Sequence, residues 1–262
     1  MEEKNKESLI YDPDDILGVA IDLAEQMLMC GAEIHRVEDT IEHICAAYGA
    51  TDIEVFTIPS LITAEIKSEN GKHSTMVRRV YSSSNDLSML ELLNALSREI
   101  CETKIEPGSA RKKINAIKGH KTYPIIIRYL GAILATASFT VFFGGTFFDA
   151  LPTAIVALFM TLYDFNKPKI FNQIMNTACL SFIGGTLSIL LISIGIGDNL
   201  DKVMIGTIMF LIPGLALGNA MRDMLCGDII SGVVRMIQAI LIAAAIALGY
   251  FVAILIFGGL LQ

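Results

Sequence analysis

The chain has 262 residues, of which 53% are hydrophobic, and a mean hydropathy of +0.57. This composition is too apolar for an ordinary soluble domain of that length, so it indicates a membrane protein. The charge is distributed unevenly: residues 1–121 hold 14 Lys or Arg and 21 Asp or Glu, whereas residues 122–262 hold 6 of each. We therefore expect a soluble first half and a lipid-embedded second half.

The cysteines and the N-terminus indicate the cellular compartment of the chain. Five cysteines are scattered without a CxxC pair, which argues against a disulfide framework or a zinc ribbon and fits a reducing environment. The N-terminus is polar and acidic, and no apolar run precedes Tyr123, so we expect no cleaved signal peptide.

Two helices are predicted first. Asp12 can cap a helix that begins at Pro13, and apolar residues then recur at helical spacing as far as Gly31. A second helix is predicted over 33–48, where the apolar residues again fall on one side.

Three strand-like runs follow, at 52–58, 61–68 and 73–81. Asn70-Gly71 lies between the last two and predicts a tight hairpin. Asn85 or Asp86 then caps a helix over 87–100. The order ααβββα predicts an α+β domain, which we assign to residues 1–106 and place in the cytoplasm.

Residues 107–121 hold five Lys or Arg and no acid. Such a run can bind nucleic acid, but its position just before an apolar segment favours a basic juxtamembrane linker, so we expect no nucleic-acid partner.

Five apolar stretches follow, each close to the length that crosses a bilayer, and they predict an all-α membrane domain over residues 122–262. They cover 123–143, 148–165, 173–196, 203–221 and 233–258. The basic residues favour alternate loops, with Lys167 and Lys169 in one and Arg222 and Arg235 in another. The predicted protein is a multi-pass inner-membrane protein with its C-terminus outside the cytoplasm.

Charged residues near the hydrocarbon are costly and are therefore functional candidates. Asp149, Asp164 and Arg128 lie close to predicted span ends, where their side chains can reach the membrane surface. For these three residues we therefore favour a snorkelling role over a functional one.

The segment 211–235 is richer in polar residues. Pro213-Gly214 interrupts the fourth apolar stretch and can open a place for polar ligands. Asn219, Arg222, Asp223 and Asp228 follow within ten residues. Two interpretations remain open for 222–235: a short amphipathic or re-entrant segment at the mouth of a pathway, and a plain loop with an Arg222–Asp223 surface pair.

Two stretches resemble the threonine/serine exporter (ThrE) family. GAEIHRVEDTIEHICAAYG (31–49) with DIEVFTIPSLI (52–62) is similar to the family's N-terminal domain, and IPGLALGNAMRDMLCGDIISGVVR (212–235) is similar to its membrane signature. The resemblance implies secondary-active export of a small carboxylate-bearing metabolite, either threonine or serine or a succinate-like dicarboxylate. Because the chain stops after five spans, it resembles the YjjP-like split form, which works in an oligomer with a separate small multi-span membrane subunit.

The resemblance also implies two groups of site residues. On the cytosolic domain it points to a functional face that docks against the membrane part or the partner, made of Glu33, Arg36, Glu38 and Asp39. For the substrate or ion pathway it points to Pro213, Gly214, Asn219, Arg222, Asp223, Asp228 and Arg235. Arginine suits a substrate carboxylate because its guanidinium donates two parallel hydrogen bonds.

Two further functions stay open. The first is a membrane-tethered hydrolase that uses Glu33, His35, Glu38 or Asp39, although no Gly-x-Ser-x-Gly, HExxH or Cys/His arrangement supports an enzyme. The second is a domain that gates or regulates transport. His35 and His43 are eight residues apart, too far for one metal site on a helix, so we expect no metal and no cofactor.

Overall fold

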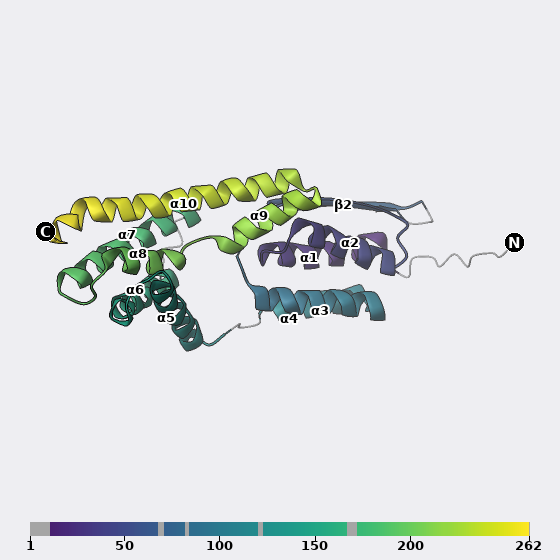
Figure 1. Cartoon of the computed structure of the whole chain (residues 1–262). Helices are drawn as coiled ribbons and strands as arrows, with labels where there is room; N and C mark the ends of the chain where they lie inside the picture. The colour runs from purple at the N-terminus through teal and green to yellow at the C-terminus, as the bar shows by residue number, and fades with distance from the viewer. Residues whose placement is uncertain (1–10, 68–70, 82–83, 120–122, 167–171, 262) are drawn as a thin grey trace. The chain divides into compact units, whose positions relative to one another are not determined.

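The structure is a computed structural model that describes residues 11–67, 71–81, 84–119, 123–166 and 172–261 (Figure 1). It divides into two compact units. Unit 1 comprises Met1–Thr122 and Leu215–Met236, and unit 2 comprises Tyr123–Gly214 and Ile237–Gln262. Residues 215–236, which we expected within the membrane domain, thus fold with the N-terminal elements.

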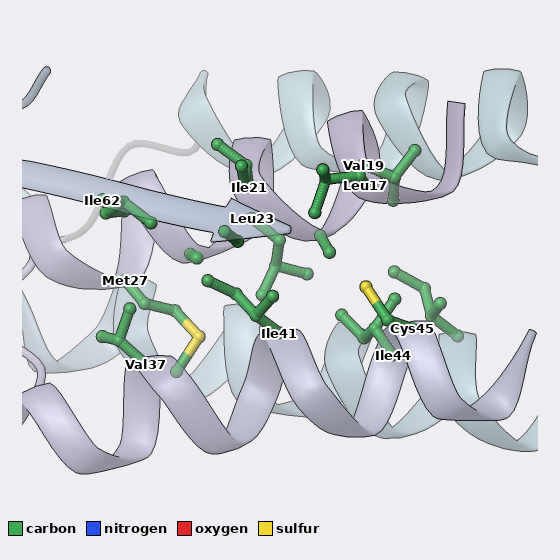
Figure 2. Packing of buried hydrophobic residues seen from close by; sticks show 14 of the residues in the cluster. Leu17, Val19, Ile21, Leu23, Met27, Val37, Ile41, Ile44, Cys45 and Ile62 are labelled. Carbon is green, nitrogen blue, oxygen red and sulfur yellow. The ribbon is translucent and has the colours of Figure 1, made fainter. Parts of the chain in front are cut away.

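The middle layer of unit 1 is a pair of helices, α1 (Pro13–Met29) and α2 (Ile34–Ala47). The predicted start of α1 is confirmed, because the Asp12 side chain accepts a hydrogen bond from the N–H of Asp14 and Pro13 occupies the first turn. Figure 2 shows Leu23 and Met27 of α1 turned toward Val37 and Ile41 of α2. Burying one such side chain contributes about 1.5–3 kcal/mol.

A three-stranded antiparallel sheet covers one side of this helix pair. Its strands are β1 (Asp52–Ile58), β2 (Leu61–Lys67) and β3 (His73–Arg79), so the three predicted strands are confirmed, β1 with the predicted bounds. In the register, Phe56 pairs with Thr63, and Thr63 with Val77. The predicted turn residue Asn70 lies outside the described residues.

Helices α3 (Leu87–Thr103) and α4 (Pro107–Lys118) pack on the other side of the pair. Asp86 caps α3, as predicted, by accepting a hydrogen bond from the N–H of Met89. Most of the segment expected to be a linker is α4, whose Ala110 and Ile114 are buried. Two of its basic residues pair with acidic ones: Arg111 lies 3.3 Å from Asp15 of α1, and Lys113 binds Glu99 of α3. The apolar spacing within the basic run explains why it forms a helix.

Unit 2 contains α5 (Ile125–Phe142), α6 (Phe147–Asn166), α7 (Gln173–Ser193), α8 (Leu200–Met209) and the later part of α10 (Ile229–Phe257), which the short helix η1 (Gly258–Leu261) follows. Four helices in the described ranges are long and apolar enough to cross a membrane: α5, α6, α7 and α10.

The fourth predicted span is broken, as the sequence indicated. Helix α8 ends at Met209, and α9 (Gly214–Cys226) begins directly after Pro213. Taken together as a pair bent by 54°, the two short helices are long and apolar enough to cross a membrane, which gives up to five spans among the described residues. The break follows from proline, which cannot donate a backbone hydrogen bond.

Candidate functional site

The site lies within unit 1, where the turn between α1 and α2 meets residues 215–236, which form a helical hairpin from α9 and the start of α10. Gly31 opens the turn with φ +88°, a left-handed conformation that favours glycine. A Cβ atom there would lie 2.7 Å from Asn85 Oδ1, so a larger residue would also displace the Asn85 side chain. The turn ends at Glu33, whose side chain makes no capping hydrogen bond to its own helix.

Asp223 of the hairpin caps α2 in place of Glu33. Its Oδ1 accepts a hydrogen bond from the backbone N–H of Ile34, the first residue of α2, at 3.1 Å. The residue is only 1% exposed. A carboxylate at this position satisfies an otherwise unpaired N–H and interacts favourably with the positive end of the helix dipole.

Arg235 completes the buried part of the site. Its guanidinium donates to the carbonyl oxygen of Ala32 at 2.7 Å and lies 3.2 Å from Asp223 Oδ2. That contact is not aligned as a hydrogen bond, and within the described part of the chain Asp223 Oδ2 accepts none. The two side chains are a buried ion pair in which each charge depends on the other.

The rim of the site is more exposed. Asn219 donates its side-chain amide to the carbonyl oxygen of Gly31 at 2.8 Å. Arg222 binds the Glu33 carboxylate, and its side chain is 62% exposed. The Arg222–Asp223 surface pair, one of our two interpretations of this segment, is therefore wrong, because successive helix residues point in different directions.

A second contact joins α2, β1 and the hairpin. Glu38 accepts a hydrogen bond from the backbone N–H of Thr57 at 2.6 Å, and Ser231 donates to the Thr57 carbonyl oxygen at 3.2 Å. Burial raises the pKa of the Glu38 carboxyl to about 6, against the lowering effect of the Thr57 N–H, and the negative charge of Asp228 adds to the rise.

The structure brings together only some of the residues that the sequence singled out. Glu33, Glu38 and the five polar residues of the hairpin are near one another, whereas Arg36 binds Asn94 and Asp39 pairs with His35 on the exposed side of α2. Pro213 and Gly214 belong to unit 2.

Some residues that form the site could not be identified from the sequence. Ala32, Ile34 and Thr57 act through backbone groups, so their side-chain types give no indication of a role. Ser231 was signalled only by its place in the quoted membrane signature.

The cluster consists of paired charges. Two guanidinium groups and two carboxylates of opposite charge are paired around one helix N-terminus: Arg222, Arg235, Glu33 and Asp223. Across the described ranges, no three His, Cys, Asp or Glu side chains come together to hold a metal ion.

Comparisons with known proteins agree with this membrane architecture. A family profile described as "Putative threonine/serine exporter" (ThrE) matches residues 18–257. A Mycobacterium tuberculosis (strain ATCC 25618 / H37Rv) protein named "Probable threonine/serine exporter" is 22% identical over 246 residues, which are 91% of this chain and 46% of that relative. The chain thus spans about half the length of the curated relative that it matches. No solved structure matches it.

Proposed function

Because the chain belongs to the ThrE family, we propose that it exports small amino acids, with threonine and serine as the substrates. The apolar helices of unit 2 supply the membrane-spanning part, and the paired charges around the α2 N-terminus supply the recognition. We place unit 1 in the cytoplasm and the C-terminus outside, and we take an ion gradient as the driving force.

The observation that carries the proposal is the buried Asp223 Oδ2, which accepts no hydrogen bond among the described residues although Arg235 lies beside it. A free amino acid carries one ammonium and one carboxylate group. We propose that the ammonium binds Asp223 and that the carboxylate first meets the exposed Arg222. A dicarboxylate has no ammonium to offer Asp223, so this arrangement favours an amino acid over succinate.

The remaining site residues have proposed roles as well. Asn219 and Arg235 orient the turn at residues 31–33, and Asp228 is a second carboxylate for a coupling ion or proton. Pro213 and Gly214 provide the break that frees backbone groups in the pathway. From the resemblance to the split form of the family, we also propose that a separate membrane subunit works with this chain.

The test is export from cells that lack the gene and carry it on a plasmid. Inverted membrane vesicles of these cells are energised and given radiolabelled threonine, serine or succinate. We expect Arg222→Ala to reduce threonine uptake into the vesicles at least tenfold, and Arg36→Ala, an exposed arginine outside the cluster, to leave it within twofold. Equal effects of the two variants refute the site, and uptake of succinate alone refutes the amino-acid substrate.

A gating role for unit 1 is the second candidate, and the capping of α2 by the hairpin favours it. The two roles predict different results when the turn is altered but the hairpin is intact. With Glu33→Gln, a gate gives an altered maximal rate at an unchanged half-saturating concentration of threonine, whereas a binding site gives a changed half-saturating concentration. The hydrolase alternative has less support, because the sequence holds no Gly-x-Ser-x-Gly, HExxH or Cys/His arrangement.

A further inference from the structure

Asp149 is a buried carboxylate of unit 2. From the sequence we expected its side chain to reach the membrane surface from a helix end, and this expectation is wrong, because the residue is 0% exposed. It lies in the first turn of α6 and faces the interior, where an isolated charge is costly.

The protein satisfies this charge with five donors. Oδ2 accepts hydrogen bonds from the N–H and the hydroxyl of Thr146 and from the side-chain amide of Asn199, at 2.8–2.9 Å. Oδ1 accepts from the backbone N–H groups of Asp198 and Asn199, at 2.7 and 2.9 Å. A carboxylate has about four lone-pair positions, so Asp149 has none left for a substrate or a proton. Its role therefore differs from that of Asp223.

The bonds from Thr146 cap α6, because the N–H of Asp149 donates back to the Thr146 hydroxyl in a capping box. The bonds from residues 198 and 199 hold the turn that precedes α8. Asn199 is the N-cap residue of α8, yet its side chain makes no capping bond to that helix and instead faces Asp149. At Gly197, with φ +99°, a Cβ atom would lie 2.9 Å from Pro152 Cγ, so the turn packs closely on α6.

Helix α8 is fixed at its other end by small and hydroxyl-bearing residues. A Cβ atom on Gly206 would lie 1.9 Å from Thr140 Oγ1. Thr140 shares a hydrogen bond of 2.8 Å with Thr153, one turn after Asp149 on α6. Thr207 shares another of 2.8 Å with the Tyr250 hydroxyl of α10. Helix α8 therefore has one defined position among α5, α6 and α10.

We propose that Asp149 is a positioning residue for export: it fixes the start of α8, the first half of the broken span, and through α8 the packing of Thr207 on Tyr250. This proposal rests on the proposed export function only where threonine uptake is measured. The second measurement, amide exchange, needs no substrate.

The experiment compares Asp149→Asn with Asp201→Asn. Asp201 is an exposed carboxylate in the first turn of α8 that pairs only with Lys202 among the described residues, so it controls for a lost charge near the same turn. In Asp149→Asn, the new amide hydrogens face N–H donors. We expect the backbone amides of 195–201 in the purified full chain to exchange with solvent at least tenfold faster than in the wild type. In inverted vesicles given radiolabelled threonine, we expect the maximal rate per molecule to fall at least tenfold, with the half-saturating concentration within twofold. Asp201→Asn is expected to change neither the amide exchange of 195–201 nor the maximal rate per molecule.

Unchanged amide exchange, or a normal maximal rate per molecule, overturns the proposal. If Asp149→Asn does not accumulate in the membrane, Asn199→Ala decides, because it removes only the bond from the side-chain amide: a reduced rate per molecule supports the proposal and an unchanged rate overturns it. If the wild-type chain exports no threonine, the proposed function fails, whereas amide exchange still decides whether Asp149 holds the turn.

Discussion

Asp223 accepts a hydrogen bond from the backbone N–H of Ile34, 189 residues earlier in the chain. The contact joins the two stretches of sequence that carry the family resemblance, one at the start of α2 and the other in the hairpin. It also explains why Glu33 is free to bind Arg222 rather than cap its own helix. The Asp223 side chain of the hairpin thereby caps the N-terminus of α2.

Removing the Asp223 charge tests this relationship. We expect Asp223→Ala to destabilise unit 1 by about 3–5 kcal/mol, because it leaves Arg235 as an uncompensated buried charge and the Ile34 N–H without its acceptor. Thermal unfolding of the full chain in detergent measures the loss. Asp39→Asn, which breaks only an exposed pair with His35, is the control and is expected to cost less than about 0.5 kcal/mol. A loss for Asp223→Ala as small as that of the control contradicts the capping role.

The exposed Arg222–Glu33 pair at the rim of the site predicts that two charge reversals partly compensate each other in stability. Glu33→Arg and Arg222→Glu each place like charges together, and the double variant restores an attractive pair with its ends exchanged. We expect a coupling free energy of no more than about 1 kcal/mol, because the Arg222 side chain is 62% exposed and solvent screens the interaction. Unfolding of the wild type and the three variants measures it, and strict additivity of the two single effects argues against the contact.

The raised pKa of Glu38 predicts that the stability of the protein depends on pH. Its pKa in the folded protein is about 6, above the ordinary value of 4.5, so the folded state binds the proton more tightly than the unfolded state. The stabilisation is fully present below pH 4.5 and is lost as the pH rises through about 6. Since the side chain is only half-buried, we expect a loss of about 1 kcal/mol across this range.

Denaturant unfolding between pH 4 and pH 7 checks this expectation. Glu38→Gln is expected to flatten the decline, whereas Glu54→Gln, at an exposed position of β1, is expected to retain it. An unchanged slope in Glu38→Gln means that another group titrates in this range.

Close packing at Gly206 predicts a steric effect in unit 2. We expect Gly206→Ala to destabilise the protein by about 1–3 kcal/mol, because the added Cβ meets Thr140 Oγ1. Gly131→Ala is the matched control on α5, since a Cβ atom there meets nothing within 4 Å. Thermal unfolding in detergent compares the two. We expect Thr140→Ala to rescue part of the Gly206→Ala loss, and a loss that persists in full in the double variant places the clash elsewhere.

The sequence by itself determined the features that depend on neighbours along the chain. Asp12 and Asp86 cap helices through N–H groups two or three residues away, and Pro213 breaks a helix by its own missing donor. The strands and the apolar stretches likewise follow from local periodicity. These signals work because both partners of each interaction lie within a few residues of each other.

The tertiary structure decided which charges meet. The sequence placed Asp223 and Arg222 side by side, but their partners are Arg235 and Glu33, and Asp149 is held by a turn about 50 residues later. It also showed that the basic run at 107–118 is a helix packed on α1. A buried charge needs donors or an opposite charge from whichever segment folding brings to it, and residue types alone do not identify that segment.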